Sequence, residues 1–163
     1  YYEKQDYANA VIYAEKVLTN TKTDDRVKSD AQIIVARAAI KTNDEVKAKD
    51  AYAKLLKIAK GELAAEALYY DAYFKNKEAK YEASNTVVQK LAKDYSGYKY
   101  FGAKGLIIMA KNFYALKDSF QATYILESVI KNFTEYTDVV EEAQKELDII
   151  KAEEAKRNAS ITE

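Results

Sequence analysis

Histidine, cysteine, proline and tryptophan are absent from this chain of 163 residues, and glycine occurs only four times. Without His or Cys the chain cannot form a Ser-His-Asp triad, a thiolate nucleophile, a zinc finger or a haem ligand. Because Gly and Pro form most turns between strands, their scarcity also disfavours sheet-rich folds. We therefore predict a helical protein that is not an enzyme.

Charge and motif patterns argue against several kinds of partner. Lys and Arg together number 26, as do Asp and Glu, and no basic run follows the spacing of a phosphate backbone, so we expect no nucleic-acid partner. No stretch of 18 apolar residues occurs, so we expect no transmembrane segment. Asp24, Asp25 and Asp30 lack the Gly and distal Glu of a calcium loop. Residues 102–105 lack the strand and the Ser or Thr of a phosphate loop, so no cofactor or metal is expected.

Four segments of the chain share one form, in which a polar turn is followed by an aromatic or aliphatic residue and then by Ala. Their final alanines are Ala10, Ala48, Ala83 and Ala122, which are spaced by 38, 35 and 39 residues. Two helices of about 14 residues with two short turns occupy that length, and such units stack to bury their apolar faces. The period therefore predicts a row of helix-turn-helix units.

Within each unit the apolar residues are spaced as on one face of a helix. Lys117 and Asp118, which follow the helix of 103–116 and precede the helix that carries 122–133, leave room only for a tight turn between antiparallel helices. Residues 33–40 and 48–59 repeat the pattern, and we expect Asn43 and Asp118 to cap the helices that follow. The four apolar sets are Leu106, Met109, Ala110, Phe113 and Leu116; Ala122, Leu126, Val129, Ile130 and Phe133; Ile33, Val35, Ala36, Ala39 and Ile40; and Ala48, Tyr52, Leu55, Leu56 and Ala59.

A different helix is expected at the C-terminal end. Thr137 is the predicted N-cap and Asp138 an acidic residue of the first turn. Its apolar positions, at 140, 143, 147 and 150, lie on one face, and the pattern stops after Ile150. A helix with a single apolar face suits the end of a stack, because its other face remains in water.

The spacing of these residues resembles that of the tetratricopeptide repeat. In the fourth unit Leu106, Met109, Ala110, Phe113 and Ala122 occupy its large, small and aromatic positions; in the second, Val35, Ala36, Ala39, Ala48 and Tyr52 do so. The chain differs from the family in three respects. Gln32 occupies the position where the family has Trp, the Pro that usually closes a repeat is absent, and Tyr81 and Phe120 lie one residue after the usual aromatic position. Residues 115–122 resemble the last repeat of large tetratricopeptide proteins of the Bacteroidetes. The resemblance implies a bacterial cell-envelope setting, periplasmic or associated with the outer membrane.

We accordingly predict an all-α fold, a right-handed α-α superhelix (solenoid) of antiparallel helix-turn-helix repeats with a C-terminal capping helix. The first unit is expected to be only the closing half of a repeat, with Tyr1 and Tyr2 as the tail of a preceding helix. The chain is thus expected to be the C-terminal piece of a longer solenoid. The single predicted domain, 1–163, comprises a partial first repeat at 1–24, repeats at 25–61, 62–97 and 98–136, a capping helix at 137–157 and a frayed tail at 158–163.

Fifteen tyrosines form the main positive signal for binding, because Tyr is large, stiff and amphipathic. Many of them cluster near the first helices of the third and fourth units, which line the concave surface of stacked hairpins. For most single Tyr residues a place between helices is the simpler interpretation. The predicted groove residues are Ile33, Arg37 and Lys41 in the second unit, Tyr69 and Tyr73 in the third, and Ile107, Lys111 and Tyr114 in the fourth.

Such a groove is aromatic and mildly basic, and suits an extended or helical peptide of some acidic character. The predicted function is a non-catalytic scaffold that binds a protein or peptide segment. The alternative is a structural module that forms a homo-oligomer through an apolar N-terminal end at residues 7–18. An enzyme ranks third; its one candidate group is Asp71, which stands among aromatic residues and for which a hydrogen bond from a Tyr is the simpler role.

Overall fold

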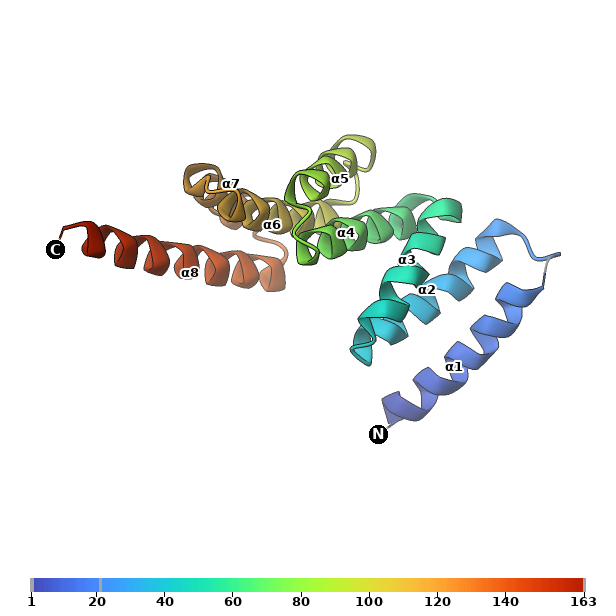
Figure 1. Cartoon of the computed structure of the whole chain (residues 1–163). Coiled ribbons are helices and arrows are strands. Elements are labelled where there is room, and N and C mark those ends of the chain that lie inside the picture. The colour runs from blue at the N-terminus through green and yellow to red at the C-terminus, as the bar shows by residue number, and fades with distance from the viewer. Residues whose placement is uncertain (1, 21, 163) are drawn as a thin grey trace. The chain divides into compact units, whose positions relative to one another are not determined.

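The computed structural model describes residues 2–20 and 22–162, with side chains from Asp6 onward. In these residues the chain forms eight α-helices and no strand, which confirms the predicted all-α class (Figure 1). Consecutive helices pack against one another. The helices are α1 (Tyr2–Thr19), α2 (Asp25–Lys41), α3 (Glu45–Ile58), α4 (Gly61–Lys77), α5 (Tyr81–Asp94), α6 (Lys99–Ala115), α7 (Ser119–Asn132) and α8 (Thr137–Ile161).

The chain divides into two compact units, and the division falls inside α4, between Asp71 and Ala72. The first unit holds α1, α2, α3 and the first part of α4. The second unit holds the rest of α4 and α5 to α8. The single repeat domain and its right-handed superhelix stay predictions.

Helix positions agree with the sequence pattern, and the differences are at the two ends. Tyr2 belongs to α1 rather than to a preceding helix, and Tyr1 lies outside the described residues. The last helix continues to Ile161, beyond the predicted end at residue 157. Residues 151–161 contain neither Gly nor Pro and are rich in Ala, Glu and Lys, which favour helix even without a buried face.

Three hairpin turns share one backbone conformation. Asn43, Ala79 and Lys117 have φ values of 57°, 59° and 70°, and each lies two residues before the second helix of its hairpin. In each turn the following N–H reaches back five residues to a carbonyl of the first helix, for example from Asp44 to Ala39 at 2.9 Å. This is the Schellman arrangement, in which a left-handed residue ends a helix. The three turns recur at intervals of 36 and 38 residues, which supports the repeat period.

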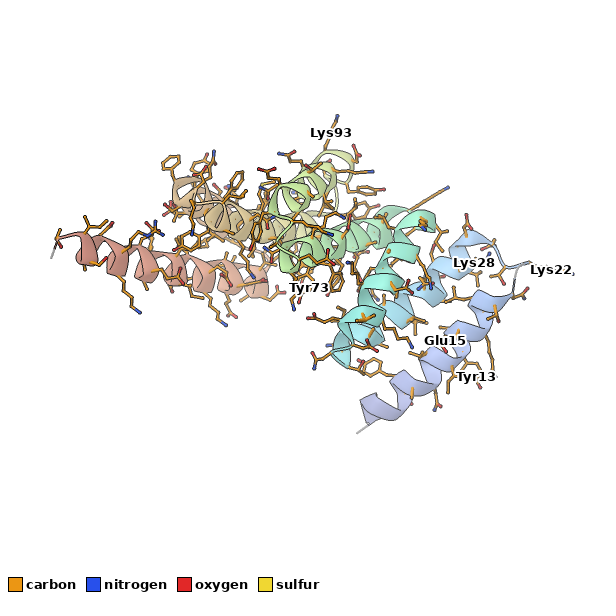
Figure 2. All side chains as sticks on the ribbon, viewed as in Figure 1. Tyr13, Glu15, Lys22, Lys28, Tyr73 and Lys93 are labelled. Carbon is orange, nitrogen blue, oxygen red and sulfur yellow. The ribbon has the colours of Figure 1, made fainter. Side chains whose placement is uncertain are left out.

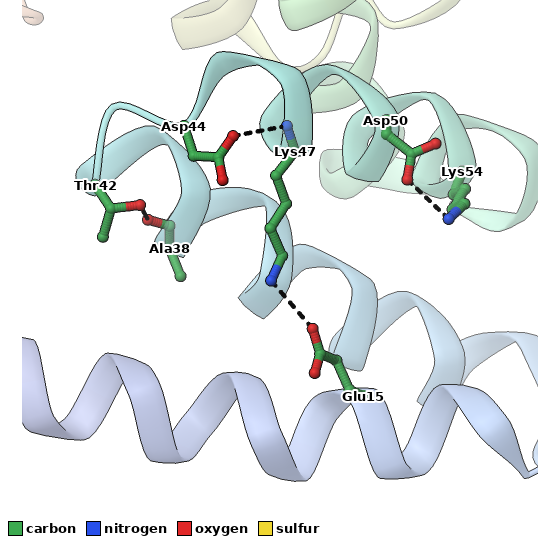
Figure 3. Close-up of polar contacts among 7 residues, drawn as sticks. All are labelled: Glu15, Ala38, Thr42, Asp44, Lys47, Asp50 and Lys54. Carbon is green, nitrogen blue, oxygen red and sulfur yellow. Dashed lines mark hydrogen bonds and ion pairs between the residues drawn. The ribbon is translucent and has the colours of Figure 1, made fainter.

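The caps of the second helices lie one residue after these left-handed positions. Asp44, and not Asn43 as predicted, caps α3 by accepting a hydrogen bond from the N–H of Lys47 at 3.1 Å (Figure 3). Asn43 instead takes the left-handed conformation, which Asn tolerates better than most residues. The predicted cap at Asp118 is confirmed by its bond from the N–H of Gln121 at 3.0 Å.

In the first unit, α2 is buried on more than one side because it packs against both α1 and α3 (Figure 1). Its buried residues include Ile33, Val35, Ala36 and Ala39, as the apolar pattern predicts. The expectation that Ile33 faces a groove is therefore wrong, since only 6% of it is exposed.

In the second unit α6 is the central helix and packs against α5, α7 and α8. Helices enclosed in this way are apolar on several faces. Consequently Ala103, Ile107, Ile108 and Ala110 are buried, whereas Leu116, predicted on the apolar face, is exposed. The remaining predicted members of that face, Leu106, Met109 and Phe113, are half-buried.

Helix α8 closes this unit with a single apolar stripe, as predicted. The stripe is formed by Val139, Ala143, Leu147 and Ile150, so Val139 takes the first position in place of the predicted Val140. Tyr136, and not Thr137, is the residue that precedes the first turn, and its side chain makes no capping bond. Asp138 lies in the first turn as expected.

Candidate functional site

A buried carboxylate joins three helices of the first unit. Glu66 on α4 has a side chain that is only 6% exposed, and it faces the guanidinium of Arg37 on α2. Arg37 donates twice, from Nε to Oε2 at 3.1 Å and from its terminal nitrogen to Oε1 at 2.7 Å. The hydroxyl of Tyr52 on α3 donates to Oε2 at 2.8 Å. Three donors therefore satisfy a charge that would be costly to bury alone.

The environment of this cluster shifts two ionisations. The hydrogen bonds with Glu66 raise the pKa of Arg37, so the guanidinium remains charged. Burial, and then the negative charge of Glu66, raises the pKa of Tyr52 far above its ordinary value, so its phenol remains neutral. The ring of Tyr52 stacks on that of Tyr70, with centroids 4.2 Å apart. Every group in the cluster has an internal partner, and the arrangement acts as a link between helices.

A chain of amides plays the corresponding part in the second unit. Asn112, fully buried on α6, accepts a hydrogen bond from Asn76 on α4 at 2.8 Å. It donates in turn to Asn85 on α5 at 2.8 Å. Beside them the hydroxyl of Ser84 donates to the carbonyl of Ala72 at 2.7 Å. Because these polar groups are paired, they fix the alignment of three consecutive helices.

Two tyrosines of α6 attach α8 along its length. Tyr100 donates to Oδ2 of Asp138 at 2.6 Å, and Tyr114 donates to Oε2 of Glu153 at 2.7 Å. The first bond lowers the pKa of Asp138, and the second raises the pKa of Tyr114. The bonded pairs are 38 and 39 residues apart, and the earlier residue of α6 pairs with the earlier residue of α8. Helix α8 therefore runs parallel to α6, one repeat period further on.

This position of α8 changes the predicted groove of the fourth unit. Ile107, which was expected to be presented, is fully buried in one cluster with Val139, Ala143 and Leu147 of α8. The expectation is wrong because the apolar stripe of the last helix covers the face that Ile107 occupies. Lys111 and Tyr114 lie further along the same helix and remain half-buried at the surface.

Lys111 and Tyr114 line a shallow hollow of about 290 Å³. Its other walls come from α4, from the start of α5 and from α8, and include Tyr81 and the partly exposed Ile149. The charged groups of this lining are one ammonium, that of Lys111, and two carboxylates. The hollow is therefore not basic, contrary to the predicted charge of the groove. Its lining residues are Asn76, Tyr81, Lys111, Tyr114, Ala115, Glu146, Ile149, Ile150 and Glu153.

Lys41 lines a larger hollow of about 820 Å³ in the first unit, between α1 and the α2–α3 hairpin. Its walls are mainly apolar and include Val11 and Val35. Lys47 belongs to the lining and forms an ion pair with Glu15 of α1 at 3.1 Å, as Figure 3 shows. Both partners of that pair are about half exposed, so the ion pair adds little stability.

The two predicted groove residues of the third unit differ in exposure. Tyr69 is 5% exposed and its ring meets that of Tyr70 edge to face, so its predicted place in a groove is wrong. It is buried because α4 carries apolar residues on several faces. Tyr73, which is labelled in Figure 2, is half-buried. The ammonium of Lys77 lies 5.2 Å from the centre of its ring. Asp71 is half-buried on the same helix and interacts with other residues.

Sequence reasoning missed Glu66 and Asn112, which organise the two polar clusters. Glu66 had a visible signal, because it is the one charged residue within the apolar stretch 63–70, whereas Asn112 directly follows Lys111 and is not isolated in this way. The sequence could not reveal which residues they bond. Arg37 lies 29 residues from Glu66, and Asn85 lies 27 residues from Asn112.

Neither a metal centre nor a membrane span is found in the part of the chain that the structure describes. In the described residues, no group of three or more acidic side chains is placed to hold a metal ion. Across residues 2–20 and 22–162, every helix is too short or too polar to cross a lipid bilayer. Comparisons of this chain with family models, with curated proteins and with solved structures find no match.

Proposed function

We propose that this protein is a non-catalytic scaffold that binds a peptide or protein segment, built as a right-handed superhelix of tetratricopeptide-like repeats. The observation that carries the proposal is that Lys111 and Tyr114, chosen for their place on the first helix of a repeat, line the same surface hollow. Apolar and charged groups lie side by side there, as in the contact surfaces of peptide-binding proteins. A place in a larger bacterial envelope protein rests on the resemblance alone.

The chemistry of the hollow defines the peptide. Tyr81 and Ile149 offer contact to an apolar side chain, and Glu146 and Glu153 offer contact to a cation. We therefore propose a segment that carries an apolar residue next to a basic one, in place of an acidic segment. Of the other predicted groove residues, Arg37, Lys41 and Tyr73 remain candidates for contact with a partner.

The test is selection from a displayed random peptide library, followed by calorimetry on the enriched peptides. We expect enriched peptides with the proposed composition, and an affinity at least tenfold lower for the variant Glu146→Ala with Ile149→Ala, which removes one carboxylate and one apolar side chain of the hollow. Glu141→Ala, which removes an exposed carboxylate on α8 outside the hollow, is the matched control and is expected to bind as the wild type. Failure to enrich any peptide, or equal affinities for all three proteins, would contradict the proposal.

Self-association is a second candidate, favoured by exposed apolar residues on α1. Ile12 is 51% and Tyr13 is 70% exposed, and Ile12 borders the hollow of the first unit. A second copy of the chain could cover them. Light scattering over a hundredfold range of concentration tests this idea. A dimer that Ile12→Glu converts to a monomer would support it, and a wild-type monomer at every concentration would eliminate it.

A further inference from the structure

A second hollow of the C-terminal unit has a different character from the one at Lys111. It lies where the end of α5, the start of α6 and the end of α7 meet, and its volume is about 330 Å³. None of its lining residues is shared with the hollow at Lys111. Its size lies at the lower end of the range of about 300–1,000 Å³ that is usual for ligand pockets.

The walls of this hollow are aromatic and aliphatic. Tyr95 and Tyr98 stand together, with ring centroids 6.3 Å apart and planes tilted by 45°. Phe133 faces them from the end of α7, and Leu91 and Leu106 complete the apolar surface. Aromatic rings prefer tilted or offset neighbours at separations of about 4.5–7 Å, so a ring placed among these three finds partners at favourable angles.

Gly102 forms part of the same lining, and nothing in the fold requires a glycine there. It lies inside α6, and a Cβ added to it would have no atom within 4 Å. At Gly105, by contrast, a Cβ would lie 3.1 Å from a side-chain carbon of Leu91, so close packing accounts for that glycine. Glycine destabilises a helix relative to alanine, and its effect at position 102 is to leave the hollow open.

The charges at the hollow favour an uncharged occupant. Lys99 and Glu135 line it with opposite signs, so it presents no net charge to an ionic group. Ser96 and Asn132 add side chains that can form hydrogen bonds with a hydroxyl or an indole N–H. An occupant with an apolar ring and at most one polar group can contact the apolar walls and form hydrogen bonds with these side chains.

We propose that this hollow binds one aromatic side chain, of Phe, Tyr or Trp, presented by a peptide segment of the partner. The inference rests on the proposed function in one respect, namely that a peptide delivers the ring. The hollow gives that scaffold a preference for a particular residue type, separate from the contacts at Lys111. Burial of a single rigid ring is a common way in which an interface gains most of its affinity.

The test uses the whole chain labelled with ¹⁵N and small probes followed by NMR. The probes are N-acetyl-tyrosinamide, N-acetyl-leucinamide and p-cresol. We expect the tyrosine probe to shift amides at 91–106 and 132–135 with at least fivefold higher affinity than the leucine probe. Equal affinities would show a merely apolar hollow and overturn the proposal, as would the absence of shifts. Tighter binding of p-cresol than of the tyrosine probe would point to a free small molecule and would also overturn it.

Substitution of Gly102 separates binding from folding. Gly102→Ala is expected to raise the melting temperature and to lower the affinity for the tyrosine probe. Gly102→Leu is expected to abolish binding of the probe while the helical circular dichroism is retained. Ala83→Leu, a similar enlargement at an exposed site on α5, should bind as the wild type. Unchanged binding in Gly102→Leu would contradict the assignment. Because the probe should still bind the variant Glu146→Ala with Ile149→Ala, failure of this inference is distinguishable from failure of the proposed peptide site.

Discussion

Glu66 shows how one residue can decide the role of another. Arg37 was predicted from its position to contact a partner, yet two of its nitrogens are bonded to the Glu66 carboxylate. Its side chain is still 56% exposed, so it can link helices and border the surface at once. Replacing Arg37 to test binding would also leave a buried charge with a single donor, Tyr52. Variants at Glu146 and Ile149 therefore give a cleaner test of function.

Tyr52 predicts a pH dependence of stability. Its pKa is raised in the folded protein, whereas an unfolded tyrosine titrates near pH 10. Its contribution is therefore complete below about pH 10 and is lost as the pH rises further, by up to about 1.4 kcal/mol per pH unit. In Tyr52→Phe we expect the free energy of unfolding to fall less steeply above pH 10. Urea unfolding between pH 8 and 11.5, followed by circular dichroism, measures this slope.

Tyr124→Phe is the matched control for this measurement, because Tyr124 is 61% exposed on α7. Its slope above pH 10 should equal that of the wild type. If Tyr52→Phe also shows the wild-type slope, the Tyr52 phenol does not stay neutral in the folded protein and the description of the cluster is wrong.

Among the elements, the three hairpin turns carry the clearest repeat signal. Two of their left-handed positions are occupied by Ala79 and Lys117, residues that adopt this conformation at a cost. The chain has four glycines, and none of them occupies these turns. The turns are specified instead by the helices on either side and by Asp44 and Asp118, which start the next helix.

Ala79→Gly is expected to stabilise the protein. Glycine removes the strain of the left-handed residue, which exceeds the added entropy of the unfolded chain, and the net gain should be about 0.5–1 kcal/mol. The urea midpoint should therefore rise. The same change in the middle of a helix, Ala152→Gly on the exposed face of α8, should lower stability by about 1 kcal/mol. A lower midpoint for Ala79→Gly would show that the turn is not under strain.

Helices and turns were largely predictable because their causes are local. The apolar period identified the helices, and the turn at Asp118 was predicted together with its cap. The errors at Asn43 and Thr137 are shifts of one residue, which is the usual uncertainty of a helix boundary inferred from a pattern. Of the predicted groove residues, Lys111 and Tyr114 line one hollow, whereas Ile33, Tyr69 and Ile107 are buried. The sequence shows which residues share a face of a helix, but it does not show which other helices pack against that face.

At the scale of the whole molecule, each of the two units contains helices that pack mainly on their neighbours in the chain. Proteins of this kind gain stability from intrinsic terms and from nearest-neighbour interfaces. Local damage should therefore remain partly local. Leu126 and Leu55 are fully buried, one in each unit, and offer matched sites for testing this expectation.

We expect Leu126→Ala to cost about 2–5 kcal/mol and to act mainly on its own unit. Hydrogen exchange followed by mass spectrometry should show faster exchange in α6, α7 and α8, with a smaller change in α1 to α3. Leu55→Ala should give the reverse pattern. If either variant accelerates exchange equally in every helix, the chain unfolds as one cooperative body.

The sequence by itself determined the helical class, the positions of the helices and the period of the hairpins, because hydrogen bonds and apolar spacing within a helix act over a few residues. Its lack of His and Cys also excluded whole classes of chemistry. Only the tertiary structure decided which faces stay open. Ile107 is covered by a helix more than 30 residues away, Glu66 and Asn112 find partners on other helices, and Gly102 opens a hollow formed by three separate helix ends. Burial depends on what packs against a face, and that information is not local.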